Sequence, residues 1–343
     1  MAWSRDGKSI VFVGAGPDSV DLWRLWVDGT RPPEPVEIAR NEGNHPEHPA
    51  TVASRDRLVF SRYGWDGHLY RFSAGRPAER VAASSSSEGD PNFSPDGRRI
   101  VFSSDRSGSG AIWVAAADGT AARQLTPDKW EWQGSPNWSP DGRLIAFDAH
   151  EVDGHVHVWT IPAEGGTPVR ITTEAGDQTA PTWSHDGRWI YFSDHRESGR
   201  EIWRIPASGG TPEQVTRTGS GFLAYESADG ASLLYQARNG DSALLAAPIT
   251  GGGAPRQLVG CVRTAAFALA GRVVFYAGCE PGMNPSLHAL DMVSGTDRLL
   301  GTLEHFPPDT SHVNFAVSPD GKDVLFLGLV RTGGDLMLIE NFR

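Results

Sequence analysis

Histidine gives this chain its most direct route to chemistry, because the imidazole ring binds transition metals and transfers protons near neutral pH. His45 and His48 are close enough along the chain to share one metal ion. Pro46 lies between them, however, and the chain has no HExxH motif and no paired Cys–His spacing. Exposed or loop-packed histidines are the simpler interpretation, and we expect no metal and no cofactor. The histidines in polar segments between apolar runs are His45, His48, His150, His195, His305 and His312.

Tryptophan offers a second kind of chemistry, the stacking that occurs at binding surfaces. Trp130 and Trp132 occur together in the polar segment "PDKWEWQGS" at 127–135, and Trp65 occurs in "YGWDG". Clustered aromatic residues on a loop suit a protein-binding hot spot or a platform for sugar rings. The alternative is that these rings are packed between structural repeats, as most of the 12 tryptophans must be.

Two charged pairs stand in equivalent segments, Asp105-Arg106 in "SSDRSG" and His195-Arg196 in "SDHRESG". Such pairs could bind a polar ligand, but their repetition favours a structural role in which they hold a loop by hydrogen bonds. A serine nucleophile is not indicated. The stretch 108–110 is only part of a Gly-x-Ser-x-Gly motif and lacks its strand-to-helix context.

Cys261 and Cys279 are the only two cysteines, and they flank the predicted hairpin "CVRTAAFALAGRVVFYAGC". If residues 269–271 form its tip, Ala268 faces Arg272 and the cysteines form a non-hydrogen-bonded pair, with Cα atoms about 4.5 Å apart. That separation lies within the disulfide range of about 4.4–6.8 Å. Two free thiols are the alternative, because the hairpin is long and its strands could diverge near Cys261. A bond would indicate an oxidising compartment.

A recurring phrase positions all of these residues. It reads "WSRDGKSIVF" from 3, "FSPDGRRIVF" from 93, "WSPDGRLIAF" from 138, "WSHDGRWIYF" from 183 and "VSPDGKDVLF" from 317. Proline and aspartate suit the central positions of a type I turn, and glycine suits the left-handed position that closes a three-residue hairpin. The phrase is therefore a hairpin tip and not a catalytic motif.

Each phrase is followed by a second apolar strand, a Gly-rich turn and a short outer strand, so each repeat predicts four antiparallel strands, A to D. The aromatic residue that ends strand B recurs eight times, at positions 12, 60, 102, 147, 192, 235, 275 and 326. A repeat of roughly 40–50 residues with four strands is the period of a β-propeller blade. We therefore predict an all-β fold, a single eight-bladed β-propeller domain spanning residues 1–343.

The last blade is expected to lack its outer strand. The final segment "DLMLIENFR" at 335–343 reads as a strand C, and the chain starts at the tail of a strand A. No N-terminal segment is then expected to complete the blade, so we expect an exposed edge, which is a pairing liability. Because the chain starts inside a repeat and has no signal-peptide pattern, we also expect it to be a piece of a longer protein.

The combination of "WSPDG", "SDR-G-IW" and "GGTP" resembles the TolB-type, WD-repeat-like propellers. The C-terminal segment from 317 is similar to the end of acidobacterial regulators in which a CadC-like winged-helix domain or a Ser/Thr kinase precedes the propeller. This resemblance implies an extracytoplasmic, periplasmic part of a membrane-anchored regulator. Propellers carry many unrelated activities, so the resemblance is specific for fold rather than for function.

Charge excludes two classes of partner. The 343 residues include 31 basic and 42 acidic ones, a net charge of −11, and no basic run interrupts them. The electrostatic signature of a nucleic-acid-binding protein is therefore missing. No apolar stretch approaches the roughly 18 residues of a membrane span. We expect a monomer without nucleic-acid binding or membrane insertion by this segment.

In a propeller, the B–C loops and D–A linkers emerge on one face, and the A–B tips emerge on the other. We predict that the loop face binds a protein or a small-molecule ligand, as the sensory or interaction module of a bacterial regulatory protein. Two alternatives stay open: a pure structural scaffold, or an enzyme that processes small molecules or oligosaccharides at a histidine site in the channel mouth, as some TolB-like propellers do. The predicted binding residues are Trp65, Trp130, Trp132, His45, His48, His150, His195, Arg196 and His312.

Overall fold

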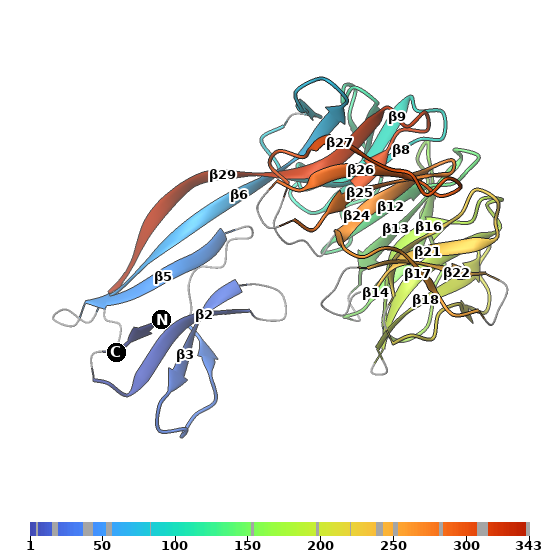
Figure 1. Cartoon of the computed structure of the whole chain (residues 1–343). Coiled ribbons are helices and arrows are strands. Elements are labelled where there is room, and N and C mark those ends of the chain that lie inside the picture. Colours follow the sequence, from blue (N-terminus) through green and yellow to red (C-terminus); the bar gives the residue numbers. More distant parts are fainter. Residues whose placement is uncertain are drawn as a thin grey trace. The chain divides into compact units, whose positions relative to one another are not determined.

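The structure is a computed structural model that describes all residues except 5, 16–19, 37–43, 53–56, 83, 152–153, 197–198, 220, 238–242, 250–252, 281–283, 307–314 and 341–343. The described residues form strands, turns and loops, and no helix occurs among them (Figure 1). In that part of the chain there is accordingly no helix able to span a membrane. The predicted all-β fold is confirmed.

Most repeats form four-stranded antiparallel blades, as predicted, with the strands side by side in chain order. Five such blades follow one another along the chain. Their strands are β8 (Glu88–Phe93), β9 (Arg99–Ser104), β10 (Ala111–Ala116) and β11 (Arg123–Gln124); β12 (Gln133–Trp138), β13 (Leu144–His150), β14 (Val156–Pro162) and β15 (Val169–Arg170); β16 (Asp177–Trp183), β17 (Trp189–Arg196), β18 (Gly199–Pro206) and β19 (Glu213–Gln214); β20 (Phe222–Glu226), β21 (Ser232–Gln236), β22 (Leu244–Pro248) and β23 (Arg256–Val259); β24 (Val262–Ala270), β25 (Val273–Gly278), β26 (Ser286–Asp291) and β27 (Asp297–Thr302).

The recurring phrase forms the tip between the first two strands of a blade. In the β12–β13 hairpin, the Ser139 hydroxyl donates to Asp141 Oδ1 (2.7 Å) and accepts from the Leu144 N–H (2.9 Å). Gly142 closes the tip with a φ of +70°, a conformation that residues with a Cβ rarely adopt. The hydrogen bond from Ser139, followed by one from the Arg143 N–H, lowers the pKa of Asp141. The polar groups of the phrase are thus engaged in building the turn.

The chain forms two compact units, of which the larger, Gly67–Gly328, contains a closed ring. Its innermost strands are β8, β12, β16, β20, β24 and β28 (Phe315–Val317), each in contact with the next, and β28 also contacts β8. The sixth blade, which we call the closing blade, combines β28, the start of β29 (Asp323–Glu340), the end of β6 (Arg57–Ser73) and β7 (Glu79–Val81). Its strands therefore come from both ends of the sequence.

This closing blade corrects one expectation. The last repeat was predicted to leave an exposed edge, but β29 pairs with β6 and β6 pairs with β7. The Ser73 hydroxyl also donates to Asp323 Oδ1 across this pair (2.6 Å). The second repeat supplies these strands, and strand pairing satisfies the backbone groups that an open edge would expose. Within the described ranges the eight repeats thus form seven sheets, because repeats two and eight share one.

The second unit comprises Met1–Asp66 and Leu329–Arg343. The first repeat forms a four-stranded sheet, and β5 (Asn44–Val52) pairs with β6 and contacts three strands of that sheet. A small core of its own contains Val11, Leu22, Leu58 and Phe60. A single domain over 1–343 stays a prediction. The strands of the first sheet are β1 (Ala2–Trp3), β2 (Ser9–Ala15), β3 (Val20–Trp26) and β4 (Glu34–Pro35).

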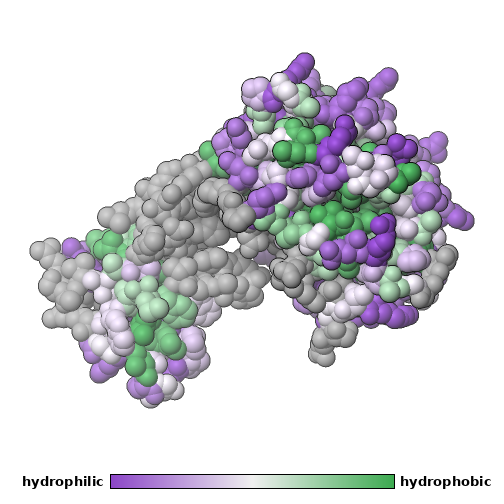
Figure 2. Space-filling view, viewed as in Figure 1, coloured by the Kyte–Doolittle hydropathy of each residue, from purple (hydrophilic) through white to green (hydrophobic). Residues whose placement is uncertain are grey.

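The cores of the ring lie between neighbouring blades. Val101 and Val114 of one blade, for example, pack in one buried cluster with Trp138 and Phe147 of the next. Alternation along each strand sends one side chain to each neighbouring blade, which explains why both faces of the strands are apolar. Hydrophilic residues cover much of the visible surface of this unit, and apolar residues form scattered patches there (Figure 2).

Cys261 and Cys279 are joined by a disulfide, with Cα atoms 5.6 Å apart. The predicted register is correct at the open end of the hairpin, where Val262 faces Gly278. It is wrong near the tip, where Ala268 faces Phe275 rather than Arg272. A bulge between positions 262 and 267 absorbs this shift of three residues, so the cysteines meet although the tip is displaced.

Candidate binding face

The innermost strands of five blades carry a β-bulge at equivalent positions near their starts. At each bulge one non-glycine residue has a left-handed φ between 43° and 54°. Such a conformation costs free energy and requires support from neighbouring groups. The five residues are Asp90, Ser135, Ala180, Leu223 and Ala265.

Side chains of the preceding blade supply that support at three of the bulges. The Ser135 N–H donates to Asp90 Oδ2 (3.2 Å), the Ala180 N–H to Asp148 Oδ2 (2.7 Å), and the Ala265 N–H to Gln236 Oε1 (2.7 Å). All three accepting side chains are buried. These polar groups near the ring centre therefore join one blade to the next.

Asp148 is the most perturbed of these groups. Its side chain is fully buried, and burial raises its pKa to about 7, with a further contribution from the negative charge of Asp90. Like charges close together in a buried site disfavour double ionisation. Asp148 is thus partly protonated at neutral pH while it accepts the hydrogen bond from Ala180.

The pair Asp105-Arg106 has the loop-holding role that its repetition favoured. Asp105 Oδ1 accepts from the Ser87 N–H (2.9 Å), and an Arg106 Nη donates to Glu88 Oε1 (2.8 Å). Glu88 is buried and also lies 3.3 Å from His68 Nδ1. This network ties a B–C loop to the closing blade.

Exposed polar residues gather at the loop ends of the two blades β12–β15 and β16–β19. His150 Nδ1 lies 3.2 Å from Glu131 Oε2, and His155 Nδ1 lies 3.5 Å from Asp177 Oδ1. Strand pairing places Asp177 opposite His195, which is exposed. We call Glu131, His150, His155, Asp177, His195 and Arg196 the loop-face strip.

Arg196 and His195, two of the nine predicted binding residues, are neighbours in the chain but have different surroundings. Arg196 is exposed, and it is fixed by Asp194 (2.6 Å) and lies over the Trp203 ring, 4.5 Å from its centroid. His195 stands beside it and faces Arg200 across the β17–β18 hairpin. Glu131, His155 and Asp177 were not singled out from the sequence. The alternation in His155-Val156-His157 was the available signal, since it sends His155 outward and His157 into the interior.

Trp130 is not an exposed binding residue, and this prediction is wrong. Its side chain is only 7% exposed and contacts the rings of Phe147 and Trp159 edge-on, with centroids 5.7 and 4.9 Å away. Packing between repeats, the alternative considered for the tryptophans, is what occurs. Trp132 is half-buried, and its ring lies so close to Gly134 that a Cβ there would come within 2.3 Å of it.

The remaining predicted binding residues lie in strands rather than loops, or outside the described residues. His45 and His48 are within strand β5 and Trp65 is within β6, rather than in loops, and their side chains lie outside the described residues. His312 also lies outside them. His305 stacks on Tyr70, with ring centroids 5.2 Å apart. Across the described residues, no three His, Cys, Asp or Glu side chains gather as metal ligands.

Comparison with known proteins agrees with this architecture. Residues 127–305, more than half of the chain, match the family model of PD40, the TolB beta propeller domain. The Tol-Pal system protein TolB of Bordetella pertussis is 31% identical over 122 residues, which are 34% of this chain and 27% of that protein. The TolB of Bordetella parapertussis is 32% identical over the same length. The match thus spans about a quarter of these curated relatives.

Solved structures extend the likeness to nearly the whole chain. TolB from Acinetobacter baumannii has a TM-score of 0.54 at 16% identity, over 96% of this chain and 81% of that one. A puromycin hydrolase has a TM-score of 0.53 at 18% identity, over 92% of this chain and 56% of that one. Identities this low show the fold alone. The family match, the repeated hairpin tips and the ring of four-stranded blades together place this chain in the TolB beta propeller domain family.

Proposed function

We propose that the chain is a non-catalytic protein-binding module that contacts its partner through the loop-face strip. One observation carries this proposal. The buried polar side chains near the ring centre join neighbouring blades, whereas His195 and Arg196 are exposed at one strand end and His150 is half-buried at another. Loops on a rigid scaffold are the usual place for such contacts. The TolB relatives are named as proteins of the Tol-Pal system, which supports a protein as the partner.

The chemistry of the strip favours a partner of mixed charge. Acidic Glu131 and Asp177 alternate with three histidines and Arg196, so a complementary surface would carry both signs. Exposed charges of this kind act mainly on association rate and specificity and are screened by salt. Binding should therefore weaken as ionic strength rises.

An enzyme with a histidine site is the less supported alternative. Such a site would bring several histidines and carboxylates to one point. In the loop-face strip they form separate pairs instead, His150 with Glu131 and His155 with Asp177. The likeness to puromycin hydrolase is a likeness of fold.

We further propose that the module works outside the cytoplasm as part of a larger bacterial regulatory protein. The disulfide between Cys261 and Cys279 supports the compartment, because such bonds persist in oxidising environments. The C-terminal sequence from residue 317, which is similar to the end of regulator propellers, supports the regulatory role. Locating the native protein by fractionation tests the first point, since a cytoplasmic protein would contradict it.

The binding test uses the purified chain immobilised on a biosensor and the other purified proteins of the Tol-Pal system of Bordetella pertussis as analytes. We expect one of them to bind, and the double variant His195→Ala/Arg196→Ala to bind at least tenfold more weakly. Arg143→Ala, on a hairpin tip at the opposite strand ends, is the control and should bind normally. If the double variant bound as tightly as the wild type, the loop-face strip would not be the binding surface. If none of these proteins bound, they would be excluded as partners.

A further inference from the structure

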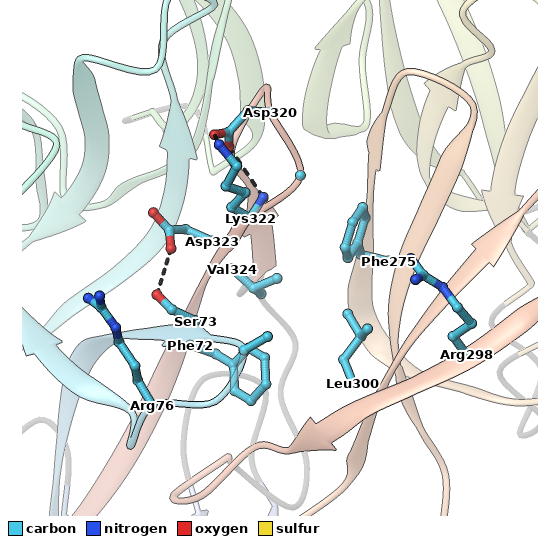
Figure 3. A pocket seen from close by; sticks show the side chains of 12 residues that line it. Phe72, Ser73, Arg76, Phe275, Arg298, Leu300, Asp320, Lys322, Asp323 and Val324 are labelled. Atoms are coloured by element: carbon cyan, nitrogen blue, oxygen red, sulfur yellow. Dashed lines mark hydrogen bonds and ion pairs between the residues drawn. The ribbon is translucent and has the colours of Figure 1, made fainter.

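A pocket of about 540 Å³ opens on the hairpin-tip side of the ring, between the β24–β27 blade and the closing blade (Figure 3). Its apolar wall consists of Phe72, Phe275, Leu300 and Val324. Three of these, Phe72, Phe275 and Val324, are almost fully buried members of one core cluster. The size falls within the range of small-molecule pockets, which is about 300–1,000 Å³.

At the junction that holds the pocket, the closing blade has a small residue where two other blades have a tryptophan. The residue that precedes the Ser-x-Asp-Gly tip is Trp138 in one blade and Trp183 in the next. Both indole rings are buried against the preceding blade. In the closing blade the same position holds Val317, which packs with Phe275 and Phe72. The missing indole leaves space at this junction.

The charged groups of the pocket are only partly paired with one another. Lys322 Nζ lies 2.9 Å from Asp320 Oδ2, and Asp323 accepts the hydrogen bond from Ser73. Arg298 lines the pocket beside Phe275 and is exposed, and no ion pair joins it to any residue that the structure describes (Figure 3). An unpaired guanidinium thus stands next to an apolar wall in a protein whose net charge is −11.

Another junction of the same ring shows how an arginine at this position is normally neutralised. Arg298 pairs with Ala289, which pairs with Phe275, four residues after the tip glycine Gly271. Arg123 stands at the equivalent place, through Val114 and Val101, four residues after Gly97. Arg298 and Arg123 are therefore equivalent residues of two blades.

At the Arg123 junction, a carboxylate from the next blade completes the site. Glu164, in the turn after β14, lies 3.6 Å from Arg123 and 2.7 Å from Arg99. The hydrogen bond and the charge of Arg99 lower the pKa of Glu164, so this carboxylate is ionised. The corresponding turn of the closing blade, residues 74–77, reads "AGRP" and carries no carboxylate. Its charged residue is Arg76, which has the opposite sign.

We propose that this pocket binds a small organic carboxylate with an apolar body about the size of one aromatic ring. The carboxylate occupies the place beside Arg298 that Glu164 occupies beside Arg123. The apolar body lies against Phe72, Phe275 and Leu300, at a junction where two other blades of the ring carry a tryptophan. Charge-assisted hydrogen bonds from a guanidinium are the strong contacts of such a site. The pocket is at the opposite strand ends from the loop-face strip, so this inference does not depend on the proposed function.

Calorimetric titration and ligand-observed NMR with 3-phenylpropanoate test the proposal on the whole chain. We expect saturable binding of this acid, and at least tenfold weaker binding of the uncharged 3-phenylpropanamide, because a charge-assisted contact contributes about 1.5–3 kcal/mol. Inorganic phosphate is titrated as a control ligand, to test whether an anion without an apolar body binds. Phosphate binding as tight as that of the acid would overturn the requirement for an apolar body.

Three variants separate the parts of the site. Arg298→Gln should weaken binding of the acid at least tenfold, and Arg123→Gln, the same change at the equivalent position of another blade, should leave it unchanged. Val317→Trp should abolish binding by filling the space while it leaves Arg298 in place. Unchanged affinity in Arg298→Gln, which alters only an exposed side chain, would overturn the proposal, as would equal affinity for the acid and the amide.

Discussion

At the loop end of the β12–β15 blade, Trp130 is enclosed by Phe147, Trp159 and the Lys129 ammonium, whose Nζ lies 4.0 Å from the ring centroid. Replacing Trp130 with Ala should lower the free energy of unfolding by about 3–5 kcal/mol, since the change leaves a cavity in the core. His195→Ala is the control and should stay within about 0.5 kcal/mol of the wild type, because its side chain is exposed. Denaturant unfolding of both variants measures this difference in stability. Equal losses in the two variants would contradict the assignment of Trp130 to the core.

Asp148 gives stability a pH dependence of unusual sign. Its pKa is about 7 in the folded chain against an ordinary value of 3.8, so the folded state holds the proton more tightly than the unfolded state does. Its contribution to stability therefore falls as pH rises from about 4 to 7, by roughly 4 kcal/mol in total. Asp148→Asn keeps an oxygen to accept from Ala180 and carries no charge. We expect it to be more stable than the wild type at pH 8 and about equally stable at pH 4.

A matched control for this prediction is Asp186→Asn, at a hairpin tip. Hydrogen bonds from the Arg188 N–H and then from Ser184 lower the pKa of Asp186 to about 2, the opposite direction. The stability that Asp186 contributes is present above its ordinary pKa and is lost as pH falls from about 4 to 2. Thermal unfolding between about pH 2 and 8 should show both variants diverging from the wild type as pH rises, with Asp148→Asn becoming the more stable and Asp186→Asn the less stable. A parallel pH profile for Asp148→Asn and the wild type would refute the raised pKa.

At the scale of the element, the β24–β25 hairpin combines a bulge with a disulfide at its open end. Replacing both cysteines by serine should lower stability by about 3 kcal/mol, the value expected for a closed loop of about 18 residues. Thermal unfolding of the oxidised wild type and of the double variant measures the difference. Titration of two free thiols in the denatured, unreduced protein would show that the bond is absent.

Strands were the part of the fold that the sequence predicted well, because their signals are local. The tip chemistry of Ser139-Pro140-Asp141-Gly142 requires only neighbouring residues, and it recurs in the same form. The bulge at 262–267 has no such signature, so the facing residue of Ala268 was misassigned. Trp130 was misplaced for a related reason, since a ring in a polar linker reads as exposed until its neighbours in the next strands are known.

At the scale of the whole chain, the sequence did not predict which strands pair when they are far apart along the chain. The closing blade joins β7 and the end of β6 to β28 and β29, and nothing in repeat two marks its strands as partners of repeat eight. The arginine pocket was missed likewise, because the equivalence of Arg298 and Arg123 depends on observed register. His150 and His195, at the ends of β13 and β17, were predicted from their place at the end of strand B, which is again a local signal.

Because the closing blade belongs wholly to the larger unit, residues 67–328 should fold without the rest of the chain. We expect this fragment to be monomeric, with a cooperative thermal transition and an intact disulfide. The control is a fragment that begins at residue 82, which lacks β7 and the end of β6. It should aggregate or unfold more readily because β29 then has an open edge. Equal stability of the two fragments would contradict the role assigned to these strands.

The order of synthesis gives the closing blade a further consequence. The ribosome makes residues 67–81 about 250 residues before their partner strand at 323–328, and translation proceeds at about 5–20 residues per second. For roughly 12–50 seconds at that rate the end of β6 can pair with β7 on one edge only, and the blades made in between can assemble only as an open arc. The nascent chain thus exposes an open strand edge throughout most of its own translation, and a chaperone that binds such edges would find its target there rather than in the finished protein.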